Sequence, residues 1–242
     1  MGLLEPPSTR DLLGFRRLVG RELEPLLLGA DKTIRRIEAR KDLIAEGDRP
    51  NSVRILLEGW AARYKQLPNG RRQVLAIMLP GDMCDANAFV LERIDYSLAS
   101  LTPLAYAEIE RAEFEALVAG SSDLLRALWR SEIRAAAIQR EWTANIGQRH
   151  AAERIAHLFC ELEVRLNRVG LIDGDEFEFP LTQADLAEST GLTPVHVNRM
   201  LQVLRQSGLI ELRSKRVRIL DREGLQTLAM FDRGYLHLDA RR

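Results

Sequence analysis

The chain has 242 residues, of which 46% are hydrophobic and 29% are charged, and its 35 basic side chains balance 35 acidic ones. This composition is typical of a globular protein with one large domain or two smaller ones, and zero net charge excludes general electrostatic coating of nucleic acid. Two cysteines are too few for a disulfide framework, and no apolar run approaches the ~20 residues of a membrane-spanning helix. We therefore expect a cytoplasmic protein with no membrane partner, in which Cys84 and Cys160 are reduced and buried.

The N-terminal half has the pattern of a β-rich domain. After a predicted helix near Thr9–Leu18, short β-type runs are separated by corners at Gly47, Gly59 and Gly81, where the backbone needs a positive φ. The Asn69-Gly70 pair is a strong hairpin signal. These features predict a jelly-roll-like β-roll whose strands lie within Lys41–Ala45, Val53–Leu57, Ala61–Leu67, Val74–Leu79 and Tyr96–Ile109.

The middle of the chain is predicted to be helical. A short helix over Arg111–Val118 precedes a long one from Ser122 to about Ile146. Seven positions of the long helix alternate at spacings of four and three, which is the pattern of a coiled-coil seam. The seam comprises Leu124, Leu128, Ser131, Ala135, Ile138, Trp142 and Asn145. We expect it to pair two chains in a homodimer; the alternative is that it packs on its own β-roll.

A hinge at Gly147-Gln148, a helix over Ala151–Leu166 and a strand-like Phe177–Phe179 are predicted to follow. Beyond them, two short helices joined by a tight turn are predicted within Leu181–Ile210. Thr182 and Asp185 form a capping pair at the start of the first helix. Thr193 and Pro194 are an N-cap and a first-turn proline for the second, after a turn at Gly191. This is the pattern of a helix-turn-helix.

The second helix has an apolar stripe that leaves a polar face outward. The stripe contains Val197, Met200, Leu201 and Leu204, so the outward face carries Val195, His196, Asn198, Arg199 and Gln202. Arginine can bridge guanine O6 and N7, and asparagine can pair with adenine. We therefore predict that this helix reads base edges in double-stranded DNA, with Arg199 as the main contact.

A basic hairpin, or wing, is predicted over Glu211–Asp221. From Arg199 to Arg218 six basic residues stand against Glu211 alone, a local charge of +5. Such a patch suits phosphate oxygens. The predicted DNA-binding set is Thr182, Thr193, Val195, His196, Asn198, Arg199, Gln202, Arg213, Lys215, Arg216 and Arg218.

This order of parts resembles the Crp/Fnr family of bacterial transcription regulators. The resemblance is carried by Gly47-Asp48, Leu57-Glu58-Gly59, Pro80-Gly81-Asp82 and the run from Leu181 to Ile210. It implies an α+β protein with a cyclic-nucleotide-binding-like effector domain over residues 1–120, a dimerisation helix over 121–147 and a winged helix-turn-helix domain over 148–242. It also implies operator DNA and RNA polymerase as partners.

The cyclic AMP site of that family is not matched by this sequence. Members that bind cyclic AMP have a Gly-Glu-Leu segment and an Arg-Ser pair that holds the phosphate; here the positions read Asp85-Ala86-Asn87 and Tyr96-Ser97. The arginine is replaced by Tyr96, and Asp85 would repel a phosphate. These five residues are the candidate effector pocket, and we predict that it does not bind cyclic AMP.

No cofactor, metal site or enzymatic activity is predicted. Oxygen-sensing relatives need N-terminal cysteines, and none precedes Cys84. Cys84 is the one candidate haem ligand in the β-roll and is read as a small core residue, while His157 and Cys160, three residues apart, are too few ligands for a metal. The effector is unknown. The alternative function is a ligand-binding or haem-based sensor that uses its winged helix for protein interaction.

Overall fold

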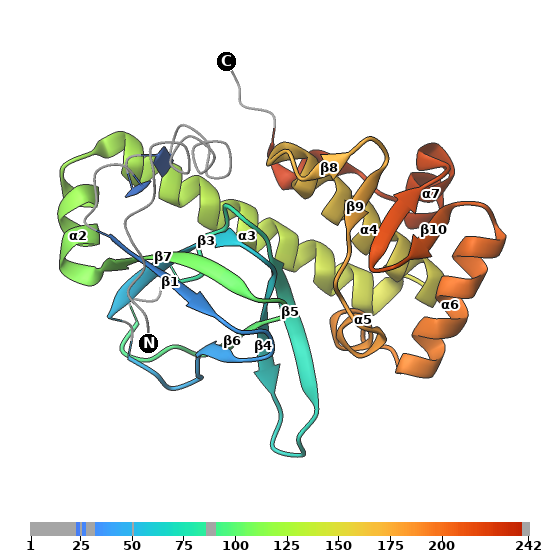
Figure 1. Ribbon diagram of the computed structural model, residues 1–242, viewed down its shortest axis with the longest axis horizontal. Helices are drawn as coiled ribbons and strands as arrows, with labels where there is room; N and C mark the ends of the chain where they lie inside the picture. Colours follow the sequence, from blue (N-terminus) through green and yellow to red (C-terminus); the bar gives the residue numbers. More distant parts are fainter. Residues whose placement is uncertain (1–22, 25, 28–31, 50, 86–90, 239–242) are drawn as a thin grey trace. The chain divides into compact units, whose positions relative to one another are not determined.

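The computed structural model describes residues 23–24, 26–27, 32–49, 51–85 and 91–238 (Figure 1). The helix expected near Thr9–Leu18 lies outside the described residues. The chain divides into two compact units: the β-roll unit, which comprises the chain up to Pro68 with Ala76–Ile133, and the C-terminal unit, which comprises Asn69–Leu75 with the chain from Arg134 onward. The division falls inside the long helix α3 (Ser122–Gln148). The sequence instead predicts this helix as a separate segment over residues 121–147.

Two antiparallel sheets build the β-roll. The first has the order β1 (Lys32–Ile37), β7 (Leu104–Glu110), β3 (Ser52–Glu58). The second has the order β2 (Asp42–Ile44), β6 (Ser97–Ser100), β4 (Ala61–Gln66), β5 (Arg72–Met78), and α2 (Arg111–Ala119) follows β7 along the chain (Figure 1). The predicted β-roll is thus confirmed, with the Tyr96–Ile109 run divided between β6 and β7.

Strand β3 is buried on both faces because it lies between two hydrophobic clusters. Val53, Ile55 and Leu57 pack in one cluster, and Leu56 points into the other. The glycine corners have the expected positive φ, and at Gly59 (φ +85°) an added Cβ would also clash with the carbonyl oxygen of Pro103. Glycine is therefore required at that corner.

The C-terminal unit packs helices around a small sheet. Its helices are α4 (Ala151–Arg168), α5 (Gln183–Thr190), α6 (Pro194–Gln206) and α7 (Arg222–Ala229). Its antiparallel sheet has the order β10 (Ile210–Arg213), β11 (Arg216–Ile219), β9 (Glu176–Glu178), β8 (Ile172–Asp173) (Figure 1). Three phenylalanines meet edge to face in the core, with Phe179 5.0 Å from Phe159 and 6.4 Å from Phe177 between ring centroids. Helix α7 and the 3₁₀ turn Arg233–Leu236 were not predicted from the sequence.

The seam predicted to join two chains is corrected by the burial of α3. Leu124 and Leu128 belong to the β-roll core of their own chain. Ile138, Trp142 and Asn145 are also buried, and the Trp142 indole donates to Glu161 at 3.0 Å. These five side chains are not available to a second chain, while Ser131 and Ala135 are half-buried.

A different stripe of α3 is exposed. Leu125, Trp129 and Ile133 follow one another at intervals of four residues, and Trp129 is 63% exposed. Residues four apart lie on one face of a helix, so these three side chains form a continuous apolar strip, called here the α3 stripe. Among the described residues no helix has the length and apolar character needed to cross a membrane.

Candidate nucleic-acid interface

The turn between α5 and α6 is built as the sequence predicts. Thr182 and Asp185 form a reciprocal capping box at the start of α5, and Gly191 ends the helix in the left-handed conformation at φ 66°. The Thr193 side chain accepts a hydrogen bond from the His196 backbone N–H at 3.2 Å, and Pro194 occupies the first turn of α6. Both threonines of the predicted DNA-binding set therefore fix helix ends with their hydroxyl groups.

Helix α6 presents most of the predicted reading face to solvent. Val197, Leu201 and Leu204 are buried, whereas Val195 is 82% exposed and Arg199 and Gln202 are exposed. His196 and Asn198 are half-buried at the edge of this face, and Gln202 donates to the Asn198 side-chain oxygen at 3.1 Å. Met200, predicted to be buried, is half-buried, and the sequence missed the exposure of Val203.

The wing is present as the β10–β11 hairpin, with Ser214 and Lys215 in its turn at positive φ. Alternation along the strands turns Leu212, Val217 and Phe177 to the inner face of the sheet. The outward face carries charged residues in two rows across the strands, which we call the wing face. One row contains Glu211, Arg218, Glu176 and Asp173, and the other contains Arg213, Arg216 and Glu178.

The predicted basic patch is therefore corrected on the wing. From Arg199 to Arg218 the sequence has one acidic residue, but the sheet sets β9 beside β11 and β8 beside β9, and these two strands bring three more carboxylates. Three arginines on the wing face lie among four carboxylates, and Arg216 forms an ion pair with Glu176. A groove of about 230 Å³ is lined by Glu176, Glu211, Arg213, Ser214, Arg216 and Arg218.

The candidate effector pocket is occupied by contacts within the chain itself. Asp85 is fully buried, and its carboxylate accepts from the Arg54 guanidinium at 2.6 Å and from the Arg54 backbone N–H at 2.7 Å. Burial raises the pKa of the Asp85 carboxyl, and the Arg54 charge opposes that shift. Glu108 lies 3.3 Å from the same guanidinium. Asp85 is therefore a structural ion-pair partner.

Tyr96, which stands where cyclic AMP-binding relatives have arginine, is also part of the interior. Its hydroxyl donates to the Cys84 carbonyl at 3.1 Å, and the Arg63 guanidinium lies 4.3 Å from its ring centroid. Burial raises the pKa of Tyr96 to about 12, so the hydroxyl stays protonated. Ser97 accepts from the Glu46 backbone N–H at 3.0 Å, and Ala86 and Asn87 lie outside the described residues.

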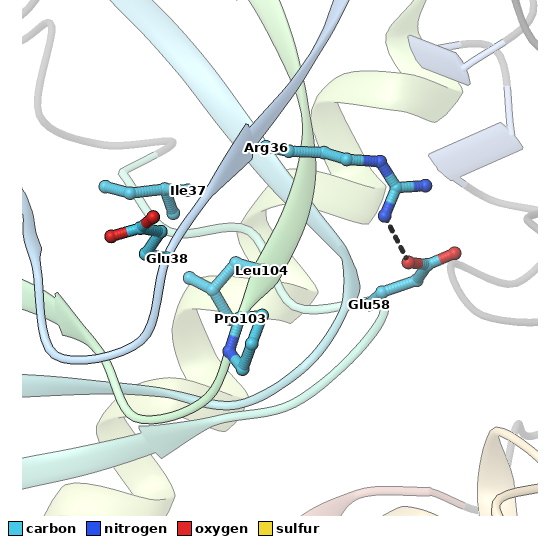
Figure 2. A pocket seen from close by; sticks show the side chains of 6 residues that line it. All are labelled: Arg36, Ile37, Glu38, Glu58, Pro103 and Leu104. Atoms are coloured by element: carbon cyan, nitrogen blue, oxygen red, sulfur yellow. Dashed lines mark hydrogen bonds and ion pairs between the residues drawn. The ribbon is translucent and has the colours of Figure 1, made fainter.

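A groove of about 350 Å³ lies elsewhere on the β-roll unit and shares no residue with the candidate effector pocket. Figure 2 shows the Arg36 guanidinium turned toward the Glu58 carboxylate, which it contacts at 3.0 Å, with Pro103 and Leu104 beside them. Arg36 and Glu58 thus neutralise each other, Glu38 adds a further carboxylate to the lining, and Ile37, Pro103 and Leu104 are apolar.

Cys84, Cys160 and His157, the candidate ligands for a metal or haem, are core residues. Cys84 and Cys160 are buried free thiols, and burial raises the pKa of each, that of Cys160 to about 12. His157 is buried against Phe231 and Tyr235, at centroid distances of 5.2 and 5.9 Å. Within the described ranges no cluster of three or more His, Cys, Asp or Glu side chains is arranged to hold a metal ion.

Comparison with known proteins agrees with this geometry. Residues 34–121 match the model of the cyclic nucleotide-binding domain, and residues 153–228 match that of the Crp-like helix-turn-helix domain. The transcriptional activator protein FnrL of Cereibacter sphaeroides is 27% identical over 188 residues, which are 76% of this chain and 75% of FnrL. The nitrogen fixation regulation protein FixK of Bradyrhizobium diazoefficiens is 28% identical over 187 residues, 77% of this chain and 78% of FixK. The structure of FixK2 from Bradyrhizobium japonicum superposes with a TM-score of 0.75 at 21% identity, over 81% of this chain and 96% of that one.

A cyclic-nucleotide-binding-type β-roll joined by a long helix to a winged helix-turn-helix defines the class of DNA-binding transcription regulators. The chain belongs to the Crp/Fnr family, whose members are transcription regulators and not enzymes.

Proposed function

We propose that this regulator binds a specific operator as a homodimer, without cyclic AMP, and acts on transcription through contact with RNA polymerase in the cytoplasm. The observation that carries the proposal is the exposed face of α6, with Val195, Arg199 and Gln202 directed to solvent from a helix whose other face is buried. Relatives such as FnrL are named transcriptional activators, which favours activation.

Base reading is assigned to α6. Arg199 is exposed and can bridge O6 and N7 of guanine, which distinguishes G·C from the other pairs in the major groove. Val195 can contact a thymine methyl group, and Asn198 and His196 are secondary contacts at the edge of the face. Lys215, in the wing turn, is the proposed phosphate contact.

Pairing of two chains is assigned to the α3 stripe. Leu125, Trp129 and Ile133 are exposed apolar side chains on one face of a long helix, and water-exposed apolar strips of this kind favour association. A two-fold dimer presents two copies of α6, so the operator should be a pseudo-palindrome with half-sites about 34 Å apart, one turn of DNA.

Independence from cyclic AMP follows from the filled pocket positions. Asp85 is paired with Arg54, and Tyr96 is held between Arg63 and the Cys84 carbonyl. A cyclic phosphate at this place would meet a carboxylate and a phenol where a binding site needs an arginine. We propose no resident cofactor, and we expect the β-roll to respond to a different signal or to none.

Selection of bound sequences from a random duplex pool, with and without cyclic AMP, tests the proposal. We expect one pseudo-palindromic motif, recovered equally in both conditions, and no heat of binding when cyclic AMP is titrated into the protein. Recovery of no motif would reject sequence-specific binding, and a motif that required cyclic AMP would reject the interpretation of the pocket.

A further inference from the structure

The wing face is an unusual surface for a DNA-binding element because acidic side chains lie among its arginines. Arg218 has Glu211 on one neighbouring strand and Glu176 on the other, at matched register positions. Arg216 lies opposite Glu178 and pairs diagonally with Glu176. Oppositely charged neighbours across strands stabilise each other. A DNA phosphate would have to compete with these carboxylates for the same guanidinium groups.

Lys215 is placed differently from the arginines. It lies in the Ser214–Lys215 turn, at φ 59°, outside the paired rows of the wing face, and its side chain is exposed. The register places Arg216 and Arg218 opposite carboxylates, whereas the residue across from Lys215 is the apolar Phe179, whose backbone N–H donates to the Lys215 carbonyl at 2.7 Å. The wing therefore has a basic side chain at its tip, Lys215, that does not lie opposite a carboxylate as Arg216 and Arg218 do.

We propose that Glu176 and Glu178, with Glu211 and Asp173, keep Arg216 and Arg218 from binding DNA phosphates and thereby limit the affinity of this protein for non-operator DNA. The inference rests on the proposed operator binding and deepens it by naming residues that determine specificity. It makes Arg216 and Arg218 structural partners of β9. Phosphate contact on the wing is left to Lys215 and to Arg213, which the register places opposite Arg216 and not opposite a carboxylate.

The physical reason lies in what a phosphate contact does to specificity. A contact with the DNA backbone strengthens binding to every sequence alike and carries no sequence information of its own. Additional arginine–phosphate contacts would increase occupancy of the many competing non-operator sites. Carboxylates that neutralise the wing arginines therefore favour discrimination by α6 without touching a base.

The test compares the protein with its Glu176→Gln, Glu178→Gln double variant in titrations of mixed-sequence duplex and operator duplex over a range of salt. We expect the variant to bind mixed-sequence duplex more tightly, with a salt slope steeper by about one for each arginine freed. The ratio of operator affinity to mixed-sequence affinity should fall. The matched control is the Glu92→Gln, Glu115→Gln double variant, which changes the charge equally and removes two carboxylates of the β-roll unit, paired with Arg49 at 3.9 Å and with Arg111 at 2.8 Å.

The converse variants keep the four carboxylates and change the basic residues of the wing. Arg216→Ala should leave the salt slope for mixed-sequence duplex unchanged, whereas Lys215→Ala should reduce it by about one. The inference is overturned if the Glu176→Gln, Glu178→Gln variant behaves like the Glu92→Gln, Glu115→Gln control, or if Arg216→Ala alone lowers the slope. If the double variant does not fold, the Arg216→Ala result decides alone. Failure of the proposed function looks different, because then the unmodified protein would show no preference for the selected operator.

Discussion

The reading face of α6 and the pocket positions of the β-roll are both places where this family is built to bind, yet their side chains are used differently. In the β-roll, Asp85 and Tyr96 are buried and bonded to Arg54, Arg63 and the Cys84 carbonyl. On α6, Arg199 and its neighbours project from a helix that is anchored by its opposite face. The same chain can therefore keep a binding surface exposed in the C-terminal unit while the residues at the corresponding pocket of the β-roll unit are buried in its core.

The largest expected change in stability comes from breaking the buried ion pair between Asp85 and Arg54 in the β-roll. Asp85→Ala would leave the Arg54 guanidinium, which has little exposure, with Glu108 as its nearest remaining carboxylate. Removal of one partner of a buried ion pair costs about 3 kcal/mol or more, so the free energy of unfolding should fall by that amount in chemical denaturation. Arg199→Ala, on the open surface, should change it by less than about 0.5 kcal/mol. Equal losses for the two variants would contradict the comparison.

The buried His157 in the C-terminal unit should make the stability of the protein depend on pH. Burial, assisted by the Arg149 charge, lowers the pKa of His157 to about 4 from its usual 6.5. Among the described residues neither ring nitrogen has a hydrogen-bond partner, although Nε2 lies 3.3 Å from the Glu141 carboxylate. Between these two pKa values the unfolded chain binds the extra proton, so stability decreases as the pH falls from 6.5 to 4.

This pH effect can be isolated by substitution. The full loss attributable to His157 is about 3 kcal/mol, and His157→Leu should remove that part of the pH dependence from denaturation curves measured between pH 4 and 7. His237→Leu, which removes an exposed histidine, is the control, and the difference between the two variants isolates the contribution of the buried ring. An unchanged slope in His157→Leu would show that the histidine does not carry the effect.

Two neighbouring residues of α3, the buried Leu128 and the exposed Trp129, allow the same comparison within one helix. Trp129→Glu on the exposed α3 stripe should give a folded monomer with at least about tenfold weaker operator binding, since one half-site contact is lost for each chain. Leu128→Ala removes a buried core side chain and should cost about 2–5 kcal/mol of stability. Light scattering and denaturation separate the two outcomes, and a dimeric Trp129→Glu variant would place the interface elsewhere.

Local signals predicted much of the architecture. The Asn69-Gly70 hairpin, the Thr182–Asp185 capping box, Gly191 and the Thr193-Pro194 start of α6 each specify a backbone conformation through a few adjacent residues, and each is present. Contacts between segments far apart in the sequence could not be predicted, because no local signal specifies them. Nothing in the spacing of Glu176 and Arg216, which are 40 residues apart, shows that they form an ion pair.

Periodicity alone also failed to select the correct face of α3. The helix carries two apolar stripes, one through Leu124 and Leu128 and one through Leu125 and Trp129, and both have helical spacing. Only the position of the β-roll core decides which stripe is buried. Helix α7 was missed because Gly224, which would otherwise disfavour a helix, lies in its first turn, where its backbone N–H is capped by the Asp221 side chain at 2.9 Å.

Reading of the operator by α6 through Arg199 is tested most directly by the affinity of Arg199→Ala for every single-base variant of the selected operator. Loss of a bidentate arginine–guanine pair should cost about 1–3 kcal/mol and abolish discrimination at one symmetry-related base position while the other positions keep theirs. Lys215→Ala should instead weaken all sequences alike. Full discrimination by Arg199→Ala at every position would contradict the assignment of α6 as the reader.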